Sequence, residues 1–281
     1  MSLNSDDETP YNEKNILISQ EDVNKILEKF GINLKCINID LYRKSLVNKS
    51  YVTRKNENII SGNEKCPNNC LPLQEESNER FEFLGDSVLS TTVANYLYKR
   101  YPEQNEGFLT KMRSKLVNGY MLSELCTHIG LNKWVIISKQ IEESGGRENY
   151  KILEDIFEAF ICAIFMDFNT LKNSELDTNT IGLGFQICEK WIINVIEDYV
   201  DFAELIKQNN NYKDKLIKYY QHTYLKTPKF FESNIDVING KKIFTIVIKD
   251  DNEQILGIGK SDSKKKAEQV ASENVLNELL S

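Results

Sequence analysis

The feature that most constrains this chain is a row of acids inside an otherwise apolar helical pattern. Residues 78–101, NERFEFLGDSVLSTTVANYLYKRY, repeat apolar side chains at helical spacing and end before Pro102. Glu79, Glu82 and Asp86 are spaced i, i+3 and i+7, which places them on one helix face. Like charges at this spacing repel, and apolar neighbours exclude the water that would screen them. The row therefore indicates a neutralising cation, although a solvated acidic stripe is the simpler interpretation of this segment alone.

Two further acids lie in the most apolar segment of the chain. Residues 149–167, NYKILEDIFEAFICAIFMD, predict a helix that is buried on nearly all sides. Asp155 and Glu158 are spaced i, i+3 within it. Buried carboxylates are rare unless they are paired, protonated or bound to metal. Two such helices suggest that their carboxylates converge, and oxygen-only ligands favour hard divalent cations such as Mg²⁺ or Mn²⁺.

These two segments resemble the signature motifs of the ribonuclease III family. The nine-residue core ERFEFLGDS is very specific, and KILEDIFEAFICAIFMD follows at the right distance. The resemblance covers nearly all of the chain after about Ser19. It implies a mainly α-helical endonuclease domain that hydrolyses phosphodiester bonds of double-stranded RNA and leaves 5′ phosphate and 3′ hydroxyl ends. Mg²⁺ is the expected cofactor, with Mn²⁺ as the alternative.

The resemblance also assigns roles to individual acids. The catalytic set that it implies consists of Glu79, Glu82, Asp86, Glu106, Asp155 and Glu158. Within that set, the metal ligands are Glu82, Asp86, Asp155 and Glu158. Glu154 departs from the family pattern, which has a small residue there. Three interpretations of Glu154 stay open: its side chain points to solvent, it raises the pKa of its neighbours, or it binds a further ion.

The signature helix carries a second implication, a homodimer formed through residues 78–101. Phe83, Gly85 and Leu89 are the expected interface residues. A glycine inside a helix costs about 1 kcal/mol relative to alanine. Gly85 therefore indicates a close backbone approach, either at that interface or near the metals.

The pattern changes after residue 211, where alternating strands replace helices. A helix at 214–222, three strands and a final helix are predicted, the last four at 230–237, 242–249, 254–259 and 263–280. This small α+β domain of α-β-β-β-α order resembles a double-stranded-RNA-binding domain, most specifically in GIGKSDSKKKAEQVA at 257–271. Three cations in the first turn of a helix oppose its dipole and so favour phosphate contact. The predicted RNA-binding residues are Lys264, Lys265, Lys266, Lys241 and Lys242, with protein contacts as the alternative role of the domain.

The domain organisation follows from these patterns. We expect a disordered acidic tail at 1–18, a catalytic domain at 19–206 with a surface insertion at about 52–77, a linker at 207–211, and an RNA-binding-like domain at 212–281. Further helices are predicted at 19–31, 109–129 and 185–206. The polar, acidic N-terminus and the lack of a long apolar run predict an intracellular protein, cytoplasmic or nuclear, with no membrane contact.

Two alternatives bear on function. Cys66 and Cys70, in CPNNC, could hold zinc, but no second such pair accompanies them, so an extended loop with free thiols is the preferred interpretation. The formal charge of −7 disfavours a generally basic nucleic-acid binder. The competing function is a double-stranded-RNA-binding or sequestering protein with little catalytic role. The presence of all six acids favours the enzyme.

Overall fold

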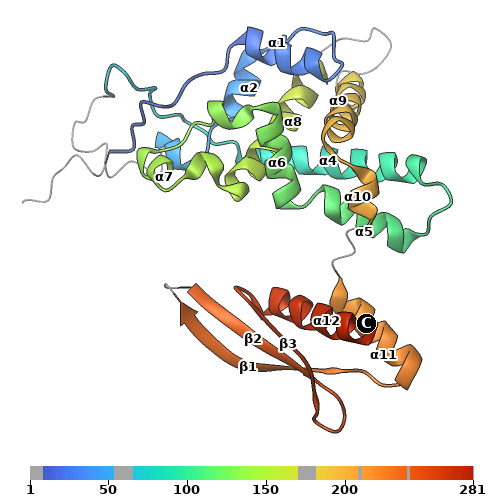
Figure 1. The fold of residues 1–281 in the computed structure, drawn as a ribbon. Helices are drawn as coiled ribbons and strands as arrows, with labels where there is room; N and C mark the ends of the chain where they lie inside the picture. The colour runs from blue at the N-terminus through green and yellow to red at the C-terminus, as the bar shows by residue number, and fades with distance from the viewer. Residues whose placement is uncertain (1–8, 54–65, 170–181, 208–210, 239–240, 281) are drawn as a thin grey trace, which may run out of the picture. The chain divides into compact units, whose positions relative to one another are not determined.

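The chain divides into two compact units, Met1–Leu205 and Ile206–Ser281. The computed structural model describes residues 9–53, 66–169, 182–207, 211–238 and 241–280 (Figure 1). The predicted linker lies largely outside these ranges, as does most of the predicted insertion. Each unit is described by itself.

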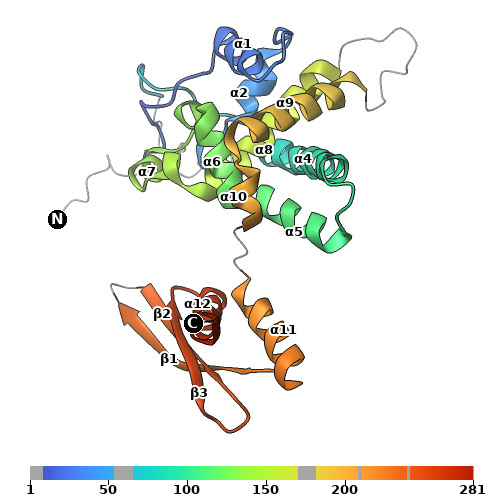
Figure 2. The same ribbon diagram turned by 45° about the vertical axis from the view of Figure 1, so that its right-hand side comes forward.

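The first unit is built from α-helices around one central helix. That helix, α8 (Tyr150–Asn169), packs against α2, α4, α6 and α9, which surround it in both ribbon views (Figures 1 and 2). Its body is almost wholly buried, as its apolar pattern predicts. Among the described residues of this unit, the α-helices are α1 (Gln20–Lys29), α2 (Ile39–Ser45), α4 (Glu79–Arg100), α5 (Glu106–Leu116), α6 (Gly119–Ile129), α7 (Lys139–Glu143), α8 and α9 (Leu183–Tyr199), with short 3₁₀ turns η2 (Lys49–Tyr51), η4 (Leu131–Trp134) and η5 (Gly146–Glu148). A further helix, α10 (Phe202–Lys207), begins in this unit and ends just past its boundary.

Two of the predicted helices each correspond to two separate helices in the structure. The prediction at 109–129 is wrong at Asn118, whose side-chain oxygen accepts a hydrogen bond from the Met121 amide at 3.1 Å and so begins a new helix, α6. The prediction at 185–206 is wrong at Asp201, whose carboxylate accepts from the amides of Ala203 and Glu204 at 2.9 and 3.1 Å. In both cases a short polar side chain satisfies free amides at a helix start, which competes with a continuous helix.

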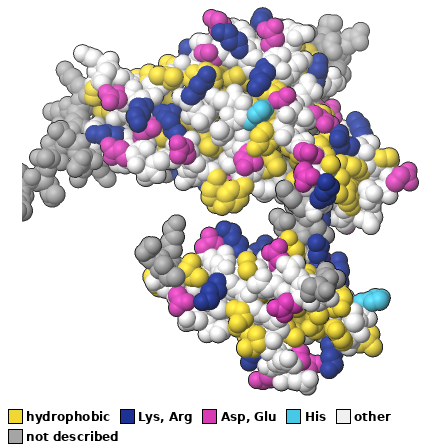
Figure 3. Space-filling model, in the orientation of Figure 1, with side chains coloured by type: hydrophobic (Ala, Val, Ile, Leu, Met, Phe, Trp, Pro, Cys, Tyr) yellow, Lys and Arg dark blue, Asp and Glu magenta, His cyan; other side chains and the backbone are white. Residues whose placement is uncertain are grey.

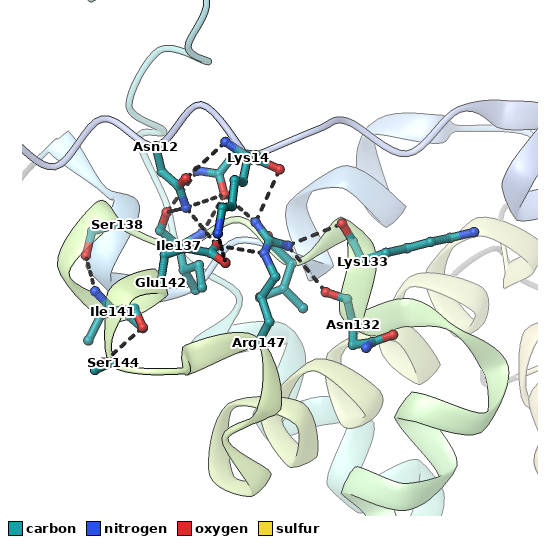
Figure 4. Close-up of polar contacts among 12 residues, drawn as sticks. Asn12, Lys14, Asn132, Lys133, Ile137, Ser138, Ile141, Glu142, Ser144 and Arg147 are labelled. Carbon is teal, nitrogen blue, oxygen red and sulfur yellow. Dashed lines mark hydrogen bonds and ion pairs between the residues drawn. The ribbon is translucent and has the colours of Figure 1, made fainter.

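The segment before α1 is ordered, so the predicted tail is wrong for residues 9–18. Asn12, Asn15 and Ile18 are buried. The side-chain amides of Asn12 and Asn15 donate to the carbonyl of Ile137 at 3.2 and 2.9 Å. Arg147 donates to the Asn15 side-chain oxygen at 3.0 Å in the same network. Figure 4 shows Arg147 and Asn12 both meeting the Glu142 carboxylate, to which they donate at 2.7 and 2.9 Å. Buried carbonyls need partners, and this segment supplies them. Residues 1–8 lie outside the described ranges.

The second unit is a three-stranded antiparallel sheet with helices on one face. Its elements are α11 (Tyr212–Tyr224), β1 (Lys229–Ile238), β2 (Lys241–Lys249), β3 (Ile255–Ser261) and α12 (Lys264–Leu280), with strand order β1-β2-β3. α12 packs on β2 and β3 and against α11. A Cβ on Gly259 would lie 2.3 Å from backbone atoms of α12. The glycine-rich strand is therefore required for close packing on the helix, and the predicted α-β-β-β-α order is confirmed.

Candidate active site

The site forms where α4 crosses α8 at Gly85. A Cβ on Gly85 would lie 1.8 Å from the carbonyl oxygen of Glu158, so the two backbones touch here. This contact places Asp86 of α4 beside Glu158 of α8. Of the two explanations offered for Gly85, the approach near the acids is the one that the structure supports.

The same contact corrects the predicted dimer surface. Gly85 is buried against α8, and Leu89 is 0% exposed in the core of the first unit. Neither residue is available to a partner, because both lie on the inward face of α4, which packs within the chain. Phe83, in contrast, points outward and is 78% exposed.

Four carboxylates from the two helices form an electrostatically coupled group. Glu158 is buried, Asp155 and Glu82 are partly exposed, and Asp86 is exposed. Burial, followed by repulsion from Asp86, raises the pKa of Glu158 to about 8. Burial, with repulsion from Asp155, also raises the pKa of Glu82, and burial raises that of Asp155. Each shift disfavours the ionised form, so a cation at this place would be strongly stabilised.

Two lysines flank the acid group. The Lys151 ammonium lies 2.9 Å from Glu154 Oε2 and 3.3 Å from Asp155 Oδ1. The second contact is an ion pair, and it lowers the pKa of Asp155 against the effect of burial. Lys49 lies 3.4 Å from Glu79 on the other side. Neither lysine was among the predicted site residues, although Lys151 is spaced i, i+4 from Asp155, a signal for an ion pair.

The donor set fits a divalent cation. The ligands would all be carboxylate oxygens, the preferred partners of Mg²⁺ and Mn²⁺, and burial raises the pKa of Glu82, Asp155 and Glu158. Among the described residues, no three Asp, Glu, His or Cys side chains stand close enough to hold one ion as they are. Mutual repulsion opposes a closer approach of the carboxylates, so ion binding requires their side chains to rotate. The assignment of individual ligands stays a prediction.

The two remaining predicted acids each have a partner outside the acid group. Glu79, in the first turn of α4, pairs with Lys49 and is near enough to Glu82 to raise its pKa. Glu106 begins α5, is exposed, and accepts a hydrogen bond from the Thr110 hydroxyl at 2.7 Å. Thus the structure brings five of the six acids into one neighbourhood, and the Glu106 carboxylate is held by its own helix.

Glu154 has a defined place beside this group. A Cβ on Gly119, the first residue of α6, would lie 2.6 Å from Glu154 Oε2, so the carboxylate rests on the start of that helix. Its side chain is 17% exposed and is paired with Lys151. It also contributes to the raised pKa of Glu158. Glu154 is therefore not directed into solvent, and its charge reaches the acid group.

The predicted RNA-binding lysines lie at the start of α12 and in β2. Lys264 lies 3.5 Å from Glu232, Lys266 lies 3.1 Å from Asp262, and Lys265 is exposed. Lys242 is exposed, whereas the side chain of Lys241 falls outside the described parts. The acid partners of Lys264 and Lys266 reduce the conflict with the helix dipole. On the face drawn in Figure 3, cationic and acidic side chains are interspersed.

The cysteines offer no zinc site in the described part of the chain. All six are free, and Cys66 and Cys70 are partly exposed. No group of three or more metal-ligating side chains includes them among the residues described. Over the same residues, the structure has no helix with the length and apolar character needed to cross a bilayer.

Sequence comparisons match each of the two units to a known protein family. Residues 38–176 match the family model "Ribonuclease-III-like", and residues 212–279 match "Double-stranded RNA binding motif". The "Ribonuclease 3" of Chlorobium luteolum is 30% identical over 245 residues, which cover 87% of this chain and 78% of that protein. A "Probable ribonuclease 3" of Acanthamoeba polyphaga mimivirus is 31% identical over 94% of this chain, which spans only 46% of that relative. The nuclease domain of ribonuclease III from Campylobacter jejuni aligns with a TM-score of 0.48 at 25% identity, covering 64% of this chain and 97% of that one.

The two family-model matches and the similarity to ribonuclease 3 relatives define a nuclease of the class that acts on double-stranded RNA. The chain belongs to the ribonuclease III family. It carries the ribonuclease-III-like domain first and the double-stranded RNA binding motif after it.

Proposed function

We propose that this protein is a divalent-metal-dependent endoribonuclease that hydrolyses double-stranded RNA and leaves 5′ phosphate and 3′ hydroxyl ends. The observation that carries the proposal is the convergence of carboxylates from two packed helices at the Gly85–Glu158 contact. Such a group is unfavourable without a cation, and it occurs in a member of a nuclease family.

The four acids Glu82, Asp86, Asp155 and Glu158 would hold the metal ions. Divalent ions supply an activated water and stabilise the leaving oxygen of a phosphodiester. Mg²⁺ is the proposed ion, with Mn²⁺ as the alternative, because both accept oxygen-only ligands.

The chain's own residues prepare this site. Burial of Glu158 excludes water on the α8 side, and its contact with the α4 backbone fixes the separation of the two helices. Lys151 and Lys49 border the acids and are 60% and 52% exposed, so their ammonium groups are accessible to RNA phosphates. Glu79 and Glu106 are proposed to lie along the RNA strand.

The proposed assembly is a homodimer through the outward face of α4. Phe83 lies on that face, and the exposed Ser87 and Thr91 follow it at helical spacing. A large aromatic side chain beside small residues suits a closely packed helix pair. Gly85 and Leu89 have no part in this surface.

The deciding experiment is a cleavage assay on a long RNA duplex in Mg²⁺. Glu158→Gln keeps the side-chain shape but removes an anionic ligand, so we expect cleavage to be nearly abolished and duplex binding to stay within a few-fold. Glu103→Gln, an exposed acid in the turn after α4, is the matched control and should cleave normally. Retained cleavage by Glu158→Gln would remove that residue from the site. A wild-type protein that binds duplex but never cuts it would favour the sequestering alternative.

A further inference from the structure

Two tyrosines form an exposed stack at the edge of the candidate active site. Tyr120, the second residue of α6, and Tyr150, the first residue of α8, have ring centroids 4.6 Å apart and planes inclined by only 14°. Their side chains remain 61% and 45% exposed. Each ring therefore covers one face of the other and leaves its second face accessible. Large aromatic residues usually bury their ring faces, so this exposed pair indicates a binding site for a ligand with an aromatic plane.

The position of the stack follows from helix geometry. Tyr150 and Glu154 are one turn apart on the face of α8 that meets α6, where Glu154 rests on Gly119 beside Tyr120. Lys151 and Asp155 occupy the adjacent face, also one turn apart. The rise from Tyr150 to Asp155 is about 7.5 Å along the helix axis. The stack is thus next to the acids, with the Lys151 ammonium at the border between them.

We propose that Tyr120 and Tyr150 form a platform for an unpaired nucleobase of the RNA substrate. The inference rests on the proposed function and adds a substrate preference to it. A base at a bulge or strand end would stack on the exposed tyrosine face, while its phosphates pass Lys151 towards the acids. In the interior of a duplex, only an unpaired base offers such a face, because stacked base pairs cover one another. Loss of an aromatic platform weakens binding about 5- to 150-fold per stacked base.

The alternative role of the pair is purely structural. Tyr120 and Tyr150 join the starts of α6 and α8 and so help to place Glu154 on Gly119. If the contact is only structural, its loss should change the stability of the protein and its affinity for every RNA equally. If the pair is a platform, its loss should change the affinity only for RNAs that present an unpaired base, and this difference defines the test.

The test uses the full chain in EDTA and an RNA duplex with one bulged 2-aminopurine, whose fluorescence falls when the base stacks. We expect wild-type protein to quench the bulged base and to bind the bulged duplex at least fivefold more tightly than the fully paired one. The Tyr120→Leu/Tyr150→Leu double variant should lose the quench and the preference while keeping its affinity for paired duplex within twofold. Tyr→Phe at both positions should retain both effects, and Tyr199→Leu, which removes another exposed tyrosine at the end of α9, serves as the matched control.

A second measurement is independent of protein folding. An abasic residue in the bulge removes the base but keeps the backbone, and wild-type protein should then lose its preference. The proposal fails if wild-type protein prefers the abasic bulge equally, if it shows no quench, or if the double leucine variant retains both effects. Cleavage of fully paired duplex in Mg²⁺ separates the two proposals. Cleavage without quenching refutes the platform alone, and quenching without cleavage refutes the nuclease alone.

Discussion

Gly85→Ala is the most direct test of the helix contact on which the acid site depends. The new Cβ would lie 1.8 Å from the carbonyl oxygen of Glu158 and 2.6 Å from its carbonyl carbon. Atoms in contact normally stand about 3.5 Å apart. Neither partner is the end of a flexible side chain, so α4 and α8 must separate for the methyl group to fit.

The size of the effect is the difference between two terms. Overpacking a well-packed core costs about 1–3 kcal/mol, and a backbone clash belongs at the upper end of that range. Replacing glycine by alanine inside a helix returns about 1 kcal/mol. We therefore expect a net loss of about 2 kcal/mol, which lowers the melting temperature of a unit of this size by roughly 4–8 °C.

Calorimetry of the first unit's transition provides the measurement. Gly107→Ala is the matched control, because its new Cβ meets only the Asn105 side chain at 3.5 Å, an ordinary contact. That variant should be unchanged or slightly more stable. Duplex cleavage by Gly85→Ala should fall as well, since the spacing of the acids changes with the helices. A Gly85→Ala protein as stable as the wild type would show that the two backbones do not touch.

Three further predictions concern pH, RNA binding and assembly. The pKa of Glu158 is higher in the folded state than in the unfolded state, so the folded state binds more protons and loses stability as pH rises towards about 8. In EDTA, the melting temperature of Glu158→Gln should exceed that of wild type at pH 8, and this difference should disappear by pH 5. A difference in melting temperature that does not depend on pH would contradict the pKa shift. Changing Lys264–Lys266 to alanine should weaken duplex binding. The slope of log affinity against log salt concentration should become shallower by up to about 0.9 per lost phosphate contact. An unchanged slope in filter-binding titrations would assign the domain to protein contacts. Phe83→Asp should give a monomer by light scattering with an unchanged melting temperature, and a variant that stays dimeric would place the interface elsewhere.

The sequence was most informative where local pattern alone decides structure. Apolar periodicity located the helices of both acid segments, and alternation with the α-β-β-β-α order located the strands of the second unit. It failed at Asn118 and Asp201, where a side chain that caps a new helix looks like an ordinary polar residue in the middle of a longer one. It also failed for residues 9–18, whose polar composition is that of a tail although Asn12 and Asn15 are buried partners of distant groups.

For the candidate site, the sequence by itself determined which acids exist and that Asp155 and Glu158 share the face of a buried helix. Helical spacing is a property of consecutive residues, so it can be counted along the chain. Only the tertiary structure decided that Gly85 lies on Glu158, that Leu89 faces the core, and that Glu154 rests on Gly119. These are contacts between helices far apart in sequence, and their distances depend on how whole helix surfaces pack.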